Sequence, residues 1–337
     1  MAVHLVLFVA AALVIAWGGV RLTRKAEYLA RVTGLGQAFL GAVVIGAITS
    51  LAGTVTSVTA AATGHPDLAV SNALGGIAAQ TTVLVIADIL YRDVNLEHAA
   101  AAEANLLQGV LLILLLAIAQ LAMAGPDISW LGIHPATPIL AVTYLLGVRM
   151  VSRAHQHPMW YPRRTAATSS EPEEARGLED SSTPADWIAV LGLTVMVAAA
   201  GWVVARSGLA IAAATGVSES LVGTLFTAVV TSLPELVIAV AAVRRGAVNL
   251  AVGNIIGGNT FDVLFLGLSD IAYRPGSVFH AVKPVSAFWV ALCMALMAVL
   301  LLGFLRRQRR GVAAIGFEGA IVLVLYLGGV AMLVWTG

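Results

Sequence analysis

Residues 250–258 read LAVGNIIGG, and residues 68–76, which precede them by 182 positions, read LAVSNALGG. The match continues without a gap. Thr49-Ser50-Leu51 faces Thr231-Ser232-Leu233, and DILYR at 88–92 faces DIAYR at 270–274. Chance similarity between apolar helices would align Leu, Ala and Val, but it would not readily align Asn, paired Gly, Asp and Tyr. The chain therefore contains an internal repeat, at about 41–92 and about 223–274.

The composition identifies the class of protein. Apolar residues make up 59% of the 337 residues, charged residues only 11%, and the mean hydropathy is +0.92. A soluble or disordered chain does not carry so little polar surface, so the sequence predicts an all-α protein embedded in a lipid bilayer. The net charge of +1 gives no reason to expect a nucleic-acid partner. The single cysteine, Cys293, excludes an internal disulfide.

Ten stretches are long and apolar enough to span a bilayer. They lie near 3–20, 35–62, 68–90, 104–124, 134–152, 186–205, 208–243, 248–272, 284–304 and 312–335. Five spans fall in a first half at 1–152 and five in a second half at 186–337. Because five is odd, the second half enters the membrane upside down, which gives the inverted repeat typical of secondary transporters.

The positive residues predict the orientation. With the N-terminus outside, the inner loops hold sixteen Arg or Lys residues and the outer loops only Arg206, Arg274 and Lys283. We therefore expect a multi-pass protein of the cell membrane with both termini outside. The segment 153–185, rich in Pro and Glu, is expected to be a cytoplasmic linker.

Carboxylates inside a membrane span are costly, and this makes them functional candidates. The second repeat carries Glu235, directly after Pro234, and Asp262. Hydroxyl, amide and carbonyl oxygens surround them, and such ligands suit hard cations. The first repeat is depleted, because Gly53 and Gln80 stand where Glu235 and Asp262 stand. The predicted cation site comprises Glu235, Asp262, Thr231, Ser232, Asn259 and Gly258 from the second repeat, and Thr49, Ser50 and Gln80 from the first.

A second acidic pair lies near span ends. Asp88 and Asp270 stand four residues before Arg92 and Arg274, a spacing that predicts a structural ion pair on each helix, with a role in the ion path as the alternative.

At these residues the chain resembles the cation/calcium exchanger superfamily, which includes the sodium/calcium exchangers. Residues 231–235 and 253–262 match the family's two repeat motifs, with Gly258 in place of a family Ser, and the first repeat matches in part. The resemblance implies that Glu235 and Asp262 bind the transported cation. It also implies that Thr231 and Thr49 lend carbonyls, while Ser232 and Ser50 lend hydroxyls.

The sequence thus favours a secondary antiporter that exchanges a divalent cation, most of all Ca²⁺, for Na⁺ or H⁺ without a resident cofactor. Two carboxylates neutralise one divalent ion, two monovalent ions or two protons. A cation channel or uniporter, an antiporter for a different cation, and a degenerate transporter acting as sensor or scaffold stay open. No motif of an intramembrane enzyme is found, so an enzyme is not expected. The oligomeric state is left open.

Overall fold

A computed structural model describes residues 1–33, 39–91, 94–100, 102–161, 163, 182–308 and 316–336. Apart from one isolated bridge between Trp130 and Ile133, the regular structure of these residues is helical. The helices of the first half are α1 (Ala2–Val32), α2 (Phe39–Thr49), α3 (Leu51–Ala62), α4 (Pro66–Leu90), α5 (Leu96–Ala99), α6 (Glu103–Ala124) and α7 (Ala136–Gln156).

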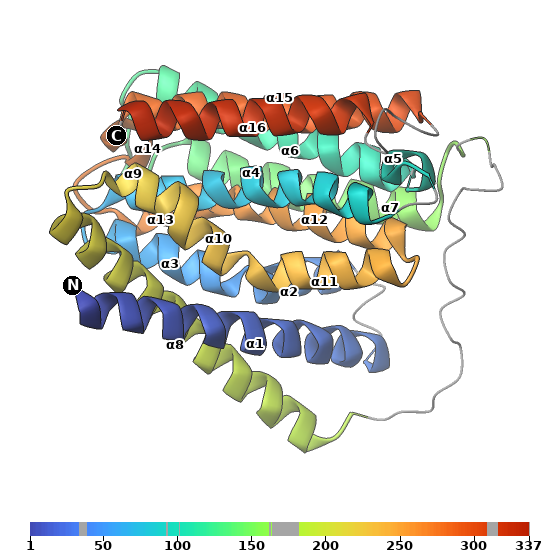
Figure 1. Cartoon of the computed structure of the whole chain (residues 1–337), viewed down its shortest axis with the longest axis horizontal. Helices are drawn as coiled ribbons and strands as arrows, with labels where there is room; N and C mark the ends of the chain where they lie inside the picture. The colour runs from blue at the N-terminus through green and yellow to red at the C-terminus, as the bar shows by residue number, and fades with distance from the viewer. Residues whose placement is uncertain are drawn as a thin grey trace.

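The second half begins with α8 (Pro184–Thr215), and the chain then turns into a broken helix. The segments that follow are α9 (Glu219–Leu221), the π-helical η2 (Val222–Thr227), α10 (Ala228–Thr231), α11 (Leu233–Arg244), α12 (Val248–Asp262), α13 (Leu264–Ala272), α14 (Val278–Ala281), α15 (Pro284–Arg306) and α16 (Phe317–Thr336). Except for α8, which runs obliquely, the long helices lie side by side along one direction (Figure 1).

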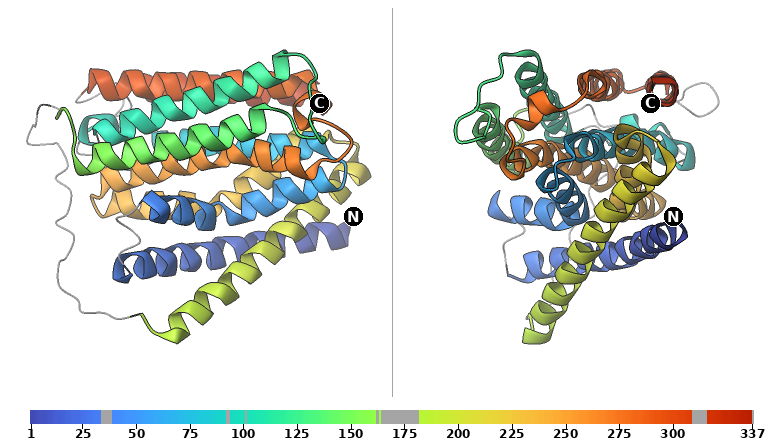
Figure 2. Two further views of the ribbon diagram at one scale, coloured as in Figure 1. Left: turned by 180° about the vertical axis from the view of Figure 1, so that it is seen from behind. Right: turned by 90° about the vertical axis from the view of Figure 1, so that its left-hand side faces the viewer.

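Seven of the described helical segments are long and apolar enough to cross a membrane, and two bent pairs raise the number to nine. The bent pairs are α2–α3, with an angle of 69°, and α9–α10 with α11, with an angle of 51°. Helix α7 lies alongside them (Figure 2) but carries Arg149 and Arg153. The predicted all-helical membrane architecture is confirmed to this extent.

The boundary between the sixth and seventh predicted spans was wrong. Helix α8 continues to Thr215 instead of ending near residue 205, and the next helix begins at Glu219 instead of 208. Gly208 does not end the helix, because it packs closely against Thr227 and Val222. The helix ends where Gly216 adopts a left-handed φ of 73°.

The two halves make matching contacts. Gly19 of α1 lies directly against Pro234, and Gly201 of α8 lies against Ala52, where an added Cβ would meet the Ala52 carbonyl oxygen at 2.7 Å. These two pairs are related by the offset of 182 positions that relates the sequence repeats. Helices α1 and α8 cross on one side of the bundle (Figure 2), and each covers the break in a helix of the other half.

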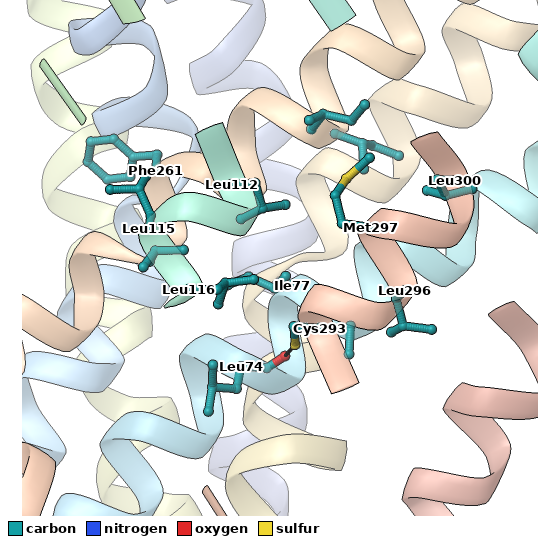
Figure 3. Packing of buried hydrophobic residues seen from close by; sticks show 14 of the residues in the cluster. Leu74, Ile77, Leu112, Leu115, Leu116, Phe261, Cys293, Leu296, Met297 and Leu300 are labelled. Carbon is teal, nitrogen blue, oxygen red and sulfur yellow. Dashed lines mark hydrogen bonds between the residues drawn. The ribbon is translucent and has the colours of Figure 1, made fainter. Parts of the chain in front are cut away.

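Helices α4 and α12–α13 form the centre, since 89% and 72% of their apolar windows are buried, compared with 22% for α1. Leu74 and Ile77 of α4 pack with Leu112, Leu115 and Leu116 of α6 and with Met297 and Leu300 of α15 (Figure 3). Cys293 is buried here and its thiol donates to the Leu74 carbonyl at 3.4 Å, as expected for a small core residue. A centre shielded from lipid is where polar side chains can be held.

The predicted pairing of Asp270 with Arg274 was wrong. Helix α13 ends at Ala272, so Arg274 is not on the same helix face and is exposed. The Asp270 carboxylate instead accepts from Val278 N at 2.9 Å, His134 N at 2.7 Å and Thr137 Oγ1 at 2.6 Å. For the first half, Arg92 lies outside the described residues, and Asp88 accepts from Leu96 N at 2.6 Å.

Candidate cation-binding site

Four helical segments meet around a small cavity between the two halves. Its volume is about 10 Å³, the space that a single water molecule requires. The lining residues are Ser50, Gly53, Asn72, Gly76 and Gln80 from the first half and Thr231, Ser232, Glu235, Asp262 and Phe265 from the second. Six of the nine residues predicted for the cation site therefore line one cavity: Ser50, Gln80, Thr231, Ser232, Glu235 and Asp262.

The cavity lies where two helices are broken at equivalent positions. Ser50 separates α2 from α3, and Ser232 separates α10 from α11. In the second half Pro234 reinforces the break, because it has no N–H to donate to the preceding turn. Each break places the first turn of a new helix at the cavity, which Gly53 of α3 and Glu235 of α11 line.

Two buried carboxylates from different helices line the cavity. The exposed fraction of Glu235 is 8% and that of Asp262 is 3%. Glu235 lies in the first turn of α11, and Asp262 is the last residue of α12. In the described part of the chain, no lysine, arginine or histidine lines this cavity. When both groups are ionised the site therefore carries two negative charges with no cationic side chain beside them.

Gln80 connects the halves across the cavity. Its Nε2 donates to Asp262 Oδ2 at 3.0 Å and to Ser232 Oγ at 3.0 Å. Gln80 and Asp262 occupy the same position of the two repeats, so equivalent residues of the two halves are hydrogen-bonded to each other. Ser50, the counterpart of Ser232, also lies within reach of the Asp262 carboxyl group.

Four buried oxygen atoms of the cavity have no hydrogen-bond partner among the described residues. They are Glu235 Oε2, Asp262 Oδ1, Gln80 Oε1 and Ser50 Oγ. Buried polar atoms in native proteins are nearly always paired, because an unpaired one costs about 1–3 kcal/mol. Oxygen atoms that lack a donor are suited to a ligand that accepts electron pairs, which means a cation or a proton.

Asn72 is a lining residue that the predicted set omitted. Its Oδ1 accepts from Thr227 Oγ1 at 2.7 Å, and its Nδ2 donates to Ser57 Oγ at 3.0 Å and to the Gly53 carbonyl at 3.3 Å. The amide thereby ties α3 and α4 to the helix that precedes Ser232. The signal was present in the sequence, because Asn72 and Asn254 are the aligned asparagines of the repeat.

An aromatic ring occupies the space of the carboxylate that the first half lacks. A Cβ added at Gly53 would lie 2.6 Å from Cε2 of the Phe265 ring, so the ring fills the space that a side chain at position 53 would enter. Phe265 is buried, comes from α13 and itself lines the cavity. Sequence reasoning noted the loss at Gly53 but did not anticipate the ring.

Three predicted residues do not line the cavity. Thr49 Oγ1 donates to the Gly46 carbonyl at 3.0 Å, and Asn259 Nδ2 donates to Thr81 Oγ1 at 2.9 Å, away from Asp262. Gly258 packs beside the site, where an added Cβ would be 3.4 Å from Gln80 Oε1. Cation binding by any of the nine residues stays a prediction.

Comparisons with known proteins agree with this geometry. Residues 3–148 and 185–335 match the model of the family described as sodium/calcium exchanger protein. Over 315 residues the chain is 29% identical to the protein CaxA of Alkalimonas amylolytica, which covers 93% of this chain and 92% of CaxA.

Solved structures of two exchangers share the fold. A crystal structure of the H⁺/Ca²⁺ exchanger CAX superposes with a TM-score of 0.68 and 14% identity, covering 98% of this chain and 88% of that one. The sodium-calcium exchanger NCX_Mj, soaked with Na⁺ and Sr²⁺, gives a TM-score of 0.61 and 18% identity over 97% of each chain. At these identities the likeness concerns the fold.

Proposed function

The chain belongs to the sodium/calcium exchanger protein family, and from this premise we propose that it is a secondary active antiporter that exchanges Ca²⁺ for Na⁺ or H⁺. The coupling ion and the transported cation are the parts of this proposal that go beyond membership of the family. The protein is a membrane transporter of inorganic cations and not an enzyme.

The observation that carries the proposal is the cavity between the halves. It combines two buried carboxylates with hydroxyl and amide oxygens, and four of its buried oxygens have no hydrogen-bond partner among the described residues. This is a donor set for a hard cation, since Ca²⁺ and Na⁺ prefer oxygen ligands. Histidine, cysteine and methionine, which softer metals prefer, are not among the described lining residues.

The charge of the cavity limits the stoichiometry. Two carboxylates balance one divalent cation, two monovalent cations or two protons, whereas three monovalent cations would leave an uncompensated positive charge. We therefore propose exchange of one Ca²⁺ for about two monovalent ions.

The proposed mechanism is alternating access around this fixed site. We propose ten spans in two inverted halves, 1–152 and 186–337, joined by a cytoplasmic linker at 153–185, with both termini outside the cell. Glu235 and Asp262 bind the cation, and Thr231, Ser232 and Ser50 supply neutral oxygens. Support comes from the location of the site at the contact between the halves, where transporters with inverted repeats bind their substrates.

The test is Ca²⁺ flux in proteoliposomes with an imposed Na⁺ gradient or pH gradient. We expect one gradient to drive Ca²⁺, and Glu235→Gln to abolish the flux because it removes half of the site's charge. Glu219→Gln is the matched control, since Glu219 lies outside the cavity, 2.7 Å from His65. Full flux in Glu235→Gln would contradict the assignment of the site.

Two other outcomes distinguish the remaining functions. Ca²⁺ movement without either gradient, still blocked by Glu235→Gln, would indicate a uniporter or channel. Flux of another cation that depends on Glu235, with no flux of Ca²⁺, would show that the depletion of the first repeat at Gly53 has changed the substrate.

A further inference from the structure

Three carboxyl side chains are buried together far from the cation cavity along α4. Asp88 lies in the last turn of α4, Glu97 in α5, and Glu318 in the first turn of α16, and each is 1% exposed. Helix α5 and the beginning of α16 lie at the end of the bundle opposite to the two chain termini (Figure 1). We refer to Asp88, Glu97 and Glu318 as the carboxyl triad.

The backbone is built around the carboxyl triad. Asp88 accepts from Leu96 N at 2.6 Å and from the backbone of Gly316. Gly303 of α15 leaves room for Glu318, because an added Cβ there would lie 2.6 Å from Glu318 Cγ. The end of α4 and the adjacent α5 thus converge with α15 and α16, which are distant in the sequence, on these carboxyl groups.

Two of the three groups face each other without a donor. Glu97 Oε2 and Glu318 Oε2 are buried and receive no hydrogen bond from any described N–H or O–H group. The carboxyl groups of Glu97 and Glu318 are within hydrogen-bonding reach of each other. Ionised carboxylates are acceptors only, so this contact can be a hydrogen bond only if a proton lies between them.

Three cationic side chains nearby contact backbone carbonyls or an aromatic ring. His98 Nδ1 lies 2.8 Å from the Arg307 carbonyl, Arg307 donates to the carbonyls of His98 and Arg163, and the Arg306 guanidinium lies 4.9 Å from the centre of the Phe317 ring. On α12, which also packs against α5, the titratable residue is Asp262 of the cation cavity. Arg92, Asp93, Arg309 and Arg310 lie outside the described residues.

The other end of the molecule shows that the fold does not require these groups. Asp270 is the repeat counterpart of Asp88, and it is satisfied by Val278 N, His134 N and Thr137 Oγ1. The positions that correspond to Glu97 and Glu318 hold Phe279 and Ala136. One end therefore has a single satisfied aspartate, while the other has two additional buried carboxyl groups.

We propose that the carboxyl triad is a proton-binding site, distinct from the cation cavity, in which Glu97 and Glu318 share at least one proton. Among the described residues no three Asp, Glu, His or Cys side chains are arranged to hold a metal ion, which favours a proton over a metal as the ligand. The bound proton holds α5 and the first turn of α16 against the end of α4, the helix that also carries Gln80.

The direction of the pH dependence follows from burial. Burial raises the pKa of Glu97 well above its ordinary value, and the charges of Asp88 and Glu318 raise it further. An acid whose pKa is higher in the folded state stabilises the fold while it is protonated. That stability is lost as the pH rises through the pKa of the folded state.

The test compares the wild type with Glu97→Phe/Glu318→Ala, which copies the residues of the opposite end, and with the isosteric Glu97→Gln. Thermal unfolding is measured in detergent between about pH 6 and pH 9 without Ca²⁺ or Na⁺. We expect the wild-type Tm to fall by about 2–4 °C with rising pH and the variants to lose this dependence. In infrared spectra at neutral pH, the C=O band of a protonated carboxylic acid should be weaker in the double variant.

An equal fall of Tm in the wild type and in both variants would overturn the proposal, as would an unchanged acid band. Should the double variant not fold, Glu97→Gln and the infrared band decide the question. Added Ca²⁺ or Na⁺ could instead raise the Tm of the wild type. If Glu97→Gln removes this rise and Glu235→Gln retains it, the carboxyl triad is a metal site and not a proton site. These readouts do not depend on transport.

Discussion

The two halves of the molecule share a backbone plan but contribute unequally to the cation cavity. The contact of Gly19 with Pro234 is repeated by Gly201 with Ala52, so the helix crossings are alike. In the cavity, however, the second half supplies both carboxylates, while the first supplies Ser50, Asn72 and Gln80. Packing constrains the small residues at the crossings in both halves alike, whereas the proposed function requires of the cavity only that its total charge be correct.

The largest effects are expected when a carboxylate is removed from the second half or moved to the first half. We expect Asp262→Asn to lower exchange by about 100-fold or more, because it removes one of two buried charges, a loss of roughly 3 kcal/mol. The exchanged pair Gln80→Asp/Asp262→Gln keeps the total charge and the same two kinds of side chain, which contact each other at 3.0 Å in the wild type. We expect it to recover flux to within roughly tenfold of the wild type on that energy scale.

If the exchanged pair is as inactive as Asp262→Asn, the position of the carboxylate matters and not the total charge. Surface expression and Tm of both variants serve as the control for folding.

A second test restores the carboxylate that the first half lacks. Gly53→Glu alone should destabilise the protein by about 1–3 kcal/mol, since the new side chain meets the Phe265 ring, and Tm measures this. Combined with Phe265→Ala, it should fold and give a steeper dependence of Ca²⁺ flux on the coupling ion, because a third negative charge accommodates another monovalent ion. Unchanged coupling in a folded double variant would contradict the charge argument.

A third test asks whether the shared contacts are equally tight in both halves. Gly201→Ala and Gly19→Ala should each lower stability by about 1–2 kcal/mol, because the added methyl group meets the backbone of Ala52 or the ring of Pro234. Gly192→Ala is the control, since it also lies on α8 and has nothing within 4 Å of its added Cβ. Tm is measured for all three, and a drop in Gly192→Ala equal to the others would contradict close packing as the cause.

The smallest expected effect comes from adding a hydroxyl. A Cβ at Gly76 would lie 3.3 Å from Ser232 Oγ and 3.8 Å from Asp262 Oδ2, so Gly76→Ser places an oxygen in the cavity. We expect affinity for the monovalent ion to increase about two- to tenfold, the range of one neutral hydrogen-bonding group. Gly258→Ser, whose position does not line the cavity, should change it less, and competition of Na⁺ with Ca²⁺ flux compares the two.

Much of the fold could be predicted from the sequence because its signals are local or repeated. The apolar stretches gave the helices, and the aligned Asn and Gly residues revealed the repeat. Glu235 and Asp262 stood out because a carboxylate inside an apolar span is costly. The end of α8 was misplaced because Arg206 and Ser207 separate two apolar stretches without interrupting the helix, which continues to Thr215.

What could not be predicted depends on contacts between distant residues. Nothing near Gly53 in the sequence indicates that Phe265 fills its space, and the spacing of Asn259 and Asp262 does not reveal that Asn259 turns to Thr81. The Asp270–Arg274 pairing failed because it assumed a continuous helix, whereas the ligands of Asp270 come in part from His134 and Thr137.

The amide of Gln80 bears on how quickly an ion can leave. Its Nε2 group donates to Asp262 Oδ2 and Ser232 Oγ, two oxygens of the proposed cation site, so in the proposed mechanism this amide competes with the cation. Displacing it costs about 1–3 kcal/mol, which weakens binding by about five- to 150-fold. The same hydrogen bonds re-form as the ion departs. Because the ion is then held weakly, it can be released quickly on either side of the membrane, which permits rapid turnover.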